Sequence, residues 1–346
     1  MRQYRLPARL CYNRSDTVSL KVISMINDPI LLNDWHAVLP LSLLEAQNGV
    51  AGARLLGEDI VIWRASEGVR AWKDLCVHRG TRLSLGEVLP DDTLQCPYHG
   101  WIYDEGGACV RIPAHPEQKP PTKARAFTYH AAVAYDFVWV CLGEPAYAIP
   151  EFVEWNDSAY RKILCGAYEF QAAGPRMVEN FLDVAHFPFV HENILGTQQR
   201  PEIPDYQVIT DENGITASDI RVFQPNPDGS HIPNWVTYTY KVHRPLVAYF
   251  RKEAAEKFAI LLMVTPIEEV RSLMWMWMVM TQGDSADASL RAFQDEIAMQ
   301  DLPIVESQRP ELLPLDLQAE LHLRSDKTAI AYRRWLNELG LSFGTS

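Results

Sequence analysis

The chain has 346 residues, of which 47% are hydrophobic and 22% are charged, and its formal net charge is −12. This composition is ordinary for a folded protein of two domains and excludes disordered and fibrous chains. The acidic balance argues against nucleic acid or an anionic membrane as a partner, because both require a basic surface. No apolar run reaches the ~18 residues that identify a membrane span, so we expect none.

Residues 1–29 are interpreted as an N-terminal extension. They mix basic and polar residues without a continuous hydrophobic stretch, so we expect no secretory signal. The chain has six cysteines, and the four outside the motif described below show no spacing typical of disulfides. A reducing, cytoplasmic location is therefore expected.

Residues 30–145 predict a small antiparallel β domain. Short β segments, for example 60–63 and 132–141, alternate with turn signals at 89–92 and 104–107. Two pairs of cysteine and histidine lie within this part of the chain, at Cys76, His78, Cys96 and His99.

These two mixed pairs are separated by seventeen residues, from His78 to Cys96. Two thiolates and two imidazoles are what a Rieske [2Fe–2S] cluster requires, with cysteines on one iron and histidines on the other. Gly80 and Gly100 follow the histidines and permit tight turns. The alternatives are a Cys₂His₂ zinc site, whose pairs are usually unmixed, or buried cysteines beside unrelated histidines. The spacing favours the cluster.

Residues 143–160 hold prolines and little periodicity, so we place a domain junction there and predict a second domain over 146–346. It should contain helices at about 175–187, 289–305 and 327–339. Strands are predicted at 235–242, 259–265 and 273–281, the last being an apolar run suited to a central strand. The predicted class is α+β, with a helix-covered antiparallel sheet that could enclose a ligand.

A second candidate metal site lies in the segment 177–191. Asn180, Asp183 and His186 are spaced by three, which would place them in a row on one helix face. Pro188 should end that helix and let His191 turn back toward His186. Two histidines and a carboxylate form the facial triad of non-haem Fe(II) oxygenases, which leaves positions open for O₂. The alternative is a pair of surface histidines at a helix end.

The third ligand should come from the helix near the C-terminus. Its candidates are Asp295, Glu296, Asp301 and Glu306, and chemistry alone leaves the choice among them open, since each could belong to a solvated face. Ala298 and Gln294 lie one and two turns before Asp301, so they could face a substrate or simply pack the helix.

Together these motifs resemble the Rieske non-haem iron oxygenases, specifically their single-subunit oxygenase components, from about Asn33 to the C-terminus. The resemblance selects Asp301 as the third iron ligand, through the pattern that ends in Glu306 and Gln308. Gln300 stands where many relatives have glutamate. The family implies a START/Bet v1-like catalytic domain, a [2Fe–2S] cluster, Fe(II) and O₂. Its electrons come from a flavin- or ferredoxin-type reductase, so that NAD(P)H acts only indirectly.

The resemblance also implies a homotrimer in which the cluster of one subunit faces the iron of the next. Asp183 would then link His99 of a neighbour to His186; alternatively, it only supports His186 in its own subunit. Asn180 would lie beside the iron without binding it, and these two are the predicted catalytic residues. Thr81 and Tyr98 replace the extra cysteine pair of respiratory Rieske proteins.

The closest resemblance is to vanillate-type O-demethylases, caffeine-type N-demethylases and the hydroxylases of saxitoxin biosynthesis. We therefore expect a terminal oxygenase that monooxygenates a small organic substrate by C–H hydroxylation of a natural-product-like compound. The alternative is oxidative O- or N-demethylation of a methylated aromatic. An electron carrier of the Rieske type would need no second metal site, and a simple ligand-binding protein would need neither site.

Overall fold

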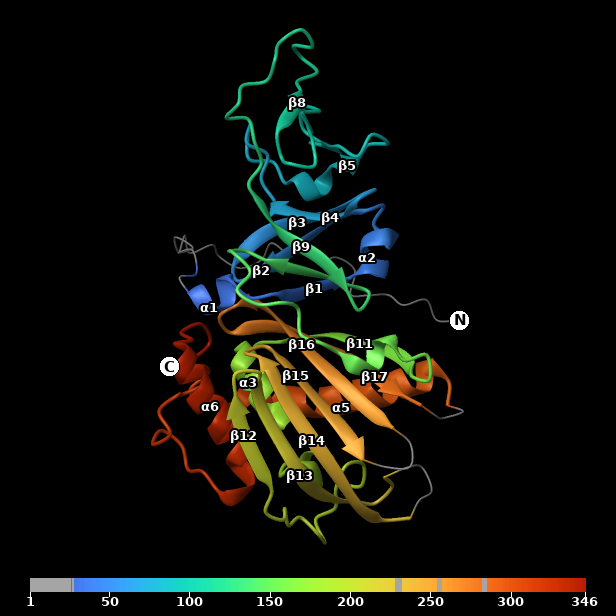
Figure 1. Cartoon of the computed structure of the whole chain (residues 1–346), viewed down its shortest axis with the longest axis vertical. Helices are drawn as coiled ribbons and strands as arrows, with labels where there is room; N and C mark the ends of the chain where they lie inside the picture. The colour runs from blue at the N-terminus through green and yellow to red at the C-terminus, as the bar shows by residue number, and fades with distance from the viewer. Residues whose placement is uncertain (1–25, 27, 228–231, 254–256, 282–284) are drawn as a thin grey trace.

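The computed structural model describes residues 26, 28–227, 232–253, 257–281 and 285–346. The predicted extension 1–29 lies almost wholly outside these residues. Three antiparallel sheets follow one another along the long axis of the molecule (Figure 1). Among the described helices, none is long and apolar enough to cross a membrane.

The first half of the chain forms two sheets. The six-stranded sheet has the order β1-β10-β9-β4-β3-β2, and the four-stranded sheet has the order β5-β6-β7-β8. The strands are β1 (His36–Pro40), β2 (Val50–Leu55), β3 (Glu58–Ala65), β4 (Gly68–Lys73), β5 (Glu87–Val88), β6 (Leu94–Gln95), β7 (Ile102–Tyr103), β8 (Cys109–Arg111), β9 (Thr128–Ala134) and β10 (Phe137–Cys141). The helices are α1 (Pro29–Leu32), α2 (Leu41–Ala46) and the 3₁₀ turn η1 (Leu83–Leu85).

The single β segment predicted at 132–141 is wrong, because the chain turns back within it. Strands β9 and β10 pair antiparallel, and the turn between them consists of Tyr135 and Asp136, both of which have positive φ (56° and 52°). Positive φ at both central residues is the type I′ hairpin geometry, which usually requires glycine or asparagine. No such residue marks the turn, so the run of apolar and aromatic residues concealed it.

The second half forms a seven-stranded sheet with the order β11-β17-β16-β15-β14-β13-β12. Its strands are β11 (Arg161–Phe170), β12 (Gln207–Asp211), β13 (Gly214–Gln224), β14 (Asn234–Arg244), β15 (Val247–Glu253), β16 (Phe258–Glu268) and β17 (Arg271–Met280). The helices are η2 (Val153–Asn156), α3 (Gly174–Leu182), α4 (Phe187–Val190), α5 (Asp287–Ser307), η3 (Arg324–Asp326) and α6 (Lys327–Leu339). Between Cys141 and Arg161 the chain passes from the six-stranded sheet to the seven-stranded sheet. The domain boundary at residue 145 stays a prediction.

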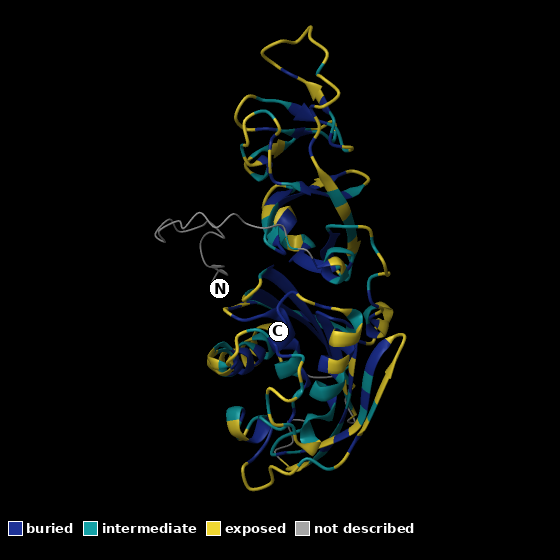
Figure 2. Cartoon of the chain, turned by 90° about the vertical axis from the view of Figure 1, so that its left-hand side faces the viewer, coloured by how far each residue is buried: buried dark blue, intermediate teal, exposed yellow. Residues whose placement is uncertain are grey.

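Strand β17 is buried on both faces, which explains its continuous apolar run. Met274 and Met276 belong to the core that α3 and α5 cover. On the other face, Trp275 and Trp277 pack in a second core with Phe137 of β10, whose ring lies 5.2 Å from that of Trp275. Buried strands therefore occupy the middle of the molecule, where the two halves meet (Figure 2).

Candidate metal centres

The two Cys–His loops share one backbone geometry. In each loop the cysteine N–H donates to the carbonyl five residues later (2.8 Å in both), and the following glycine donates back to the cysteine carbonyl (2.9 and 3.1 Å). These glycines, Gly80 and Gly100, have φ of +72° and +66°, which residues with side chains rarely adopt. The spacing in the sequence thus encodes two matching loops.

The side chains of these loops are placed as a cluster requires. Cys76 and Cys96 are buried, and the rings of His78 and His99 lie 4.5 Å apart. Among the described residues, the buried His78 Nδ1 has no hydrogen-bond partner, which suits a nitrogen that binds metal. Trp101 stacks on His78 at 4.5 Å and fixes the ring. The two thiols and two imidazoles could therefore hold a [2Fe–2S] cluster.

Tyr103 is a hydrogen-bond donor to this centre. Its hydroxyl lies 3.1 Å from Cys76 Sγ. Burial raises the pKa of Tyr103, and the neighbouring Cys76 thiol raises it further, so the hydroxyl stays protonated. Donors to cluster sulfurs stabilise the reduced form, which carries more negative charge.

We expect Tyr103→Phe to lower the reduction potential of the cluster by about 40 mV, which corresponds to one hydrogen bond of ~1 kcal/mol in a one-electron couple. A redox titration followed by EPR measures it. Tyr129→Phe, a change at a tyrosine of strand β9 outside the Cys–His loops, is the control. Equal potentials in the two variants would contradict the assignment.

The segment that carries the two other histidines differs from the prediction. Helix α3 ends at Leu182, and Asp183 leaves it with extended angles (φ −84°, ψ 126°). The predicted row of Asn180, Asp183 and His186 on one helix is therefore wrong. The Asp183 carboxylate accepts from the Ala185 N–H (2.7 Å) and so stabilises the break.

The prediction that Pro188 ends the long helix is wrong. Pro188 instead lies at the beginning of a short helix. It lies in the first turn of α4, where its missing N–H removes no helical bond. This turn of helix separates His186 from His191 and brings their rings to a centroid distance of 5.1 Å. The two histidines are thus brought together, although by a different local structure.

Three ligand atoms converge at this point. His186 Nε2 and His191 Nε2 are 3.2 Å apart, and Asp301 Oδ1 lies 3.5 Å from the first and 3.2 Å from the second. A metal about 2.1 Å from each of three ligands at right angles would place those ligands ~3.0 Å apart. His186, His191 and Asp301 therefore form a site of the right size for a metal ion.

Hydrogen bonds at the outer ring nitrogens orient both imidazoles. His186 Nδ1 donates to Asp183 Oδ2 (3.2 Å), and His191 Nδ1 donates to Gln300 Oε1 (2.7 Å). Both Nε2 lone pairs then face each other and the Asp301 carboxylate, an arrangement that a cation would stabilise. Burial lowers the pKa of His191, but Asp301 and the hydrogen bond with Gln300 together raise it, and the net shift is upward. The site favours positive charge, and Fe(II) fits it.

The four candidate carboxylates lie in different environments. Only Asp301, among these four, reaches the histidines. Asp295 accepts from the Tyr168 hydroxyl (2.6 Å), Glu306 accepts from the Gln171 N–H (2.8 Å), and Glu296 is exposed. In the sequence analysis Gln300 stood out only as a departure from the glutamate of many relatives. In the structure it is the hydrogen-bond partner of His191 Nδ1. Its position directly before Asp301 was the available signal.

A cavity of about 390 Å³ opens beside the three ligand atoms. Apolar side chains, among them methionines and aromatic rings, form most of its wall, with Asn180, Gln294 and Ala298 also among the lining residues. Gln294 and Ala298 are 7% and 1% exposed, and Gln294 Nε2 has a contact of 3.7 Å with the Met276 sulfur. Both predicted substrate residues therefore lie in the wall of the cavity.

The two candidate centres lie in different halves of the chain. The Cys–His loops adjoin β5–β8 at one end of the molecule, whereas α3 and α5 lie on the larger sheet in the other half (Figure 1). His99 is exposed, and so is 37% of the Asp183 side chain. Each centre thus has a solvent-accessible side that another chain could approach.

A protein with a cluster of this kind and a mononuclear iron site is a metal-dependent oxidoreductase. Residues 34–128 match the Rieske [2Fe-2S] domain, and residues 170–341 match the vanillate O-demethylase oxygenase C-terminal domain. The chain belongs to the Rieske non-haem iron oxygenases. It is a monooxygenase that carries a [2Fe–2S] cluster and Fe(II) and needs a reductase.

Several relatives cover nearly the whole chain. Methylxanthine N1-demethylase NdmA of Pseudomonas putida is 31% identical over 91% of this chain and 92% of its own length. Methylxanthine N3-demethylase NdmB of the same organism is 30% identical over 89% of each. The structure of NdmA with caffeine has a TM-score of 0.78 and 28% identity, covering 89% of this chain and 91% of that one. The predicted family, fold class and terminal oxygenase activity are confirmed.

Proposed function

We propose that the enzyme oxidatively removes a methyl group from an uncharged N- or O-methylated aromatic compound. The observation that carries this proposal is the apolar cavity beside the His186, His191 and Asp301 site. Its volume of about 390 Å³ suits a small organic molecule. The amide groups of Asn180 and Gln294 add hydrogen-bonding capacity to this wall. The methylxanthine demethylases that match most of the chain support a heteroaromatic substrate.

The proposed roles of the metal-binding residues follow from their geometry. Cys76, Cys96, His78 and His99 would hold the cluster, and His186, His191 and Asp301 would hold Fe(II). When bound, these groups supply the reductive activation of O₂ that places one oxygen atom in a C–H bond. Asp183 and Gln300 keep the imidazoles in the tautomer that leaves Nε2 free.

The balance of the reaction separates the two candidate activities. A methyl carbon on nitrogen or oxygen, with O₂, two electrons and two protons, gives a hydroxymethyl group and water. The bond between that carbon and the heteroatom then breaks, which releases formaldehyde and leaves the heteroatom protonated. C–H hydroxylation of a natural-product-like skeleton uses the same first step, but its product keeps all its carbon atoms.

A product assay distinguishes them. The iron-loaded enzyme is supplied with a reductase, NADH and O₂, and is offered matched pairs of methylated and unmethylated heteroaromatics. Formaldehyde in equal amount to the demethylated product supports the proposal. A product heavier by one oxygen atom, without formaldehyde, would make the enzyme a hydroxylase instead.

We further propose that the active form is a homotrimer, in which Asp183 bridges His186 and the partner's His99. The support is the separation of the two centres in one chain and the exposure of His99 and Asp183. A carboxylate between two imidazoles would give electrons a short hydrogen-bonded path. Sedimentation equilibrium of the holoenzyme tests the subunit number, and a monomer with full activity would overturn this assembly.

We expect Gln294→Leu to raise the KM for substrates with a carbonyl or ring nitrogen by about threefold to tenfold, the worth of one hydrogen bond. The iron content should not change, because Gln294 lies about 10 Å along the helix from Asp301. Steady-state kinetics measure the effect, with Met299→Leu at an exposed position of the same helix as control. An unchanged KM would mean that Gln294 only packs α5.

A further inference from the structure

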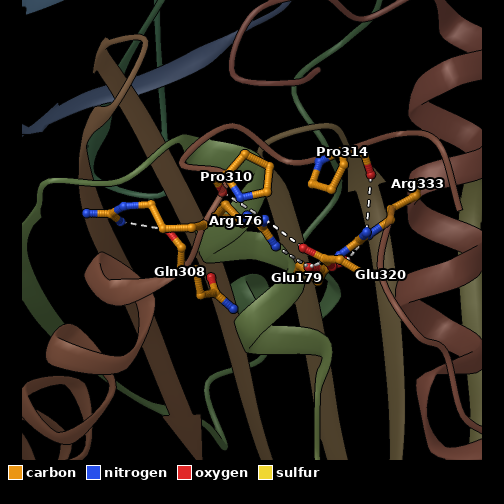
Figure 3. Close-up of polar contacts among 8 residues, drawn as sticks. Arg176, Glu179, Gln308, Pro310, Pro314, Glu320 and Arg333 are labelled. Atoms are coloured by element: carbon orange, nitrogen blue, oxygen red, sulfur yellow. Dashed lines mark hydrogen bonds and ion pairs between the residues drawn. The ribbon is translucent and has the colours of Figure 1, made fainter. Parts of the chain in front are cut away.

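Four charged side chains form a cluster of two buried arginines and two partly exposed glutamates (12% and 29% side-chain exposure), composed of Arg176, Glu179, Glu320 and Arg333. The two arginines are each 2% exposed. Figure 3 shows the carboxylates of Glu179 and Glu320 lying between the two guanidinium groups. We call this group the charge cluster. It joins α3, α6 and the segment that connects α5 to α6.

The charge cluster is held by forked hydrogen bonds. Arg333 donates from Nε and Nη2 to the two oxygens of Glu179 (2.5 and 2.8 Å). Arg176 Nη2 donates to Glu320 Oε1 (2.9 Å), and Arg333 Nη2 donates to the other oxygen of Glu320. Two arginines balance two glutamates. Burial opposes ionisation, but the hydrogen bonds and opposite charges together outweigh it, so the pKa of Glu320 is lowered and that of Arg333 is raised. Glu320 and Arg333 are therefore held in their ionised forms.

The same arginines hold the backbone that follows α5. Arg176 Nη2 donates to the carbonyl of Pro310 (2.9 Å), and Arg333 Nη1 donates to that of Pro314 (3.2 Å). Pro310 follows Asp301 by nine residues, and Glu179 directly precedes Asn180 on α3. The charge cluster therefore ties the helix that leads to the histidines to the segment that leads from the carboxylate.

Stability alone is a weak explanation for such a group. Replacing a buried ion network with apolar residues is often neutral or stabilising, whereas removing one member leaves an unpaired charge. The fixed fork of a guanidinium on a carboxylate instead specifies distance and orientation. The four side chains lie outside the described wall of the cavity, so substrate contact does not explain them.

We propose that the charge cluster is a positioning device for the mononuclear site. It sets the position of α3 against the segment after α5, and with it the separation of the histidine pair from Asp301. Glu179 and Arg333 are positioning residues in this sense, because they act on the metal ligands through the backbone. This inference rests on the proposed iron site.

The test compares three variants of the holoenzyme. Glu179→Gln leaves two buried guanidinium groups that share a single ionised partner, Glu320. The double variant E179M/R333M removes one charge of each sign and keeps Arg176 with Glu320. Glu169→Gln is the matched control, because Glu169 pairs with Arg271 at a more exposed site (43% and 31% side-chain exposure). The Fe(II) dissociation constant is measured by equilibrium dialysis, and nitric oxide is added as a spectroscopic probe of ligand geometry by EPR.

We expect Glu179→Gln to lower the melting temperature and to weaken Fe(II) binding about tenfold, the lower end of the effect of outer partners on metal affinity. The double variant should regain the melting temperature, since its charges balance, but it should keep the weakened binding and an altered EPR signal. Glu169→Gln should match the wild type. The absorbance of the [2Fe–2S] cluster should be the same in the wild type and in all three variants.

Wild-type affinity and EPR signal in the double variant would overturn the inference and leave the charge cluster a purely structural feature. The double variant decides the matter even where Glu179→Gln does not fold. Failure of the proposed iron site is a different result, because the wild-type enzyme itself would then bind no iron beyond its cluster.

Discussion

We expect Asp301→Ala to abolish substrate oxidation and to reduce the iron content from about three to about two atoms per chain. The change removes the anionic ligand, whose Oδ1 lies 3.2 Å from His191 Nε2 and 3.5 Å from His186 Nε2. Two neutral imidazoles alone hold Fe(II) poorly. Iron and acid-labile sulfide are measured together, so that loss of the mononuclear iron is distinguished from loss of the cluster.

The control for this variant is Asp295→Ala on the same helix. Asp295 accepts a hydrogen bond from the Tyr168 hydroxyl and takes no part in the metal site. It should retain about three iron atoms per chain. Full iron content in Asp301→Ala would exclude Asp301 as a ligand and reopen the choice of the third ligand.

We expect Asp183→Asn to slow oxidation of the reduced [2Fe–2S] cluster, in the presence of substrate and O₂, about a hundredfold, the upper range for loss of an outer partner. The carboxylate accepts from His186 Nδ1 with one oxygen and from the Ala185 N–H with the other. An amide has only one accepting oxygen, so one of these donors would meet an NH₂ group. Stopped-flow absorbance of the cluster measures the rate.

This variant also separates the two roles considered for Asp183. A bridge between subunits predicts normal iron content and normal cluster reduction, with only the transfer between the centres slowed. Support of His186 within one subunit predicts weaker Fe(II) binding instead. Glu192→Gln, which changes a half-buried carboxylate next to His191, is the control and should behave as the wild type.

Features encoded within a few residues were predictable from the sequence. The spacing of Cys76, His78, Cys96 and His99 defines two loops whose hydrogen bonds are local, so the motif alone indicates the cluster. The strand at 273–281 was also predicted, within one residue at its C-terminal end. Only the structure shows that this strand is buried on both faces, because the apolar run does not indicate which segments pack against each face.

Features that join distant residues were less predictable. Asp301 lies more than a hundred residues from the histidines, and only family resemblance distinguished it from Asp295, Glu296 and Glu306. The end of α3 was misplaced because a proline can either end a helix or begin one. Only the bond from the Ala185 N–H to Asp183 decided between these. The charge cluster combines three separate segments and had no sequence signal.

The two faces of β17 have a consequence for how this enzyme could change its specificity. Met274 and Met276 form part of the cavity wall, while Trp275 and Trp277 pack toward the half that carries the cluster. One strand is therefore all that separates the substrate from that packing. Substitutions in the cavity wall on β17 would disturb the packing against the half of the chain that carries the Cys–His loops. Substitutions in the wall formed by α5 would not. We expect the evolution of new substrate preferences to proceed mainly through the helix.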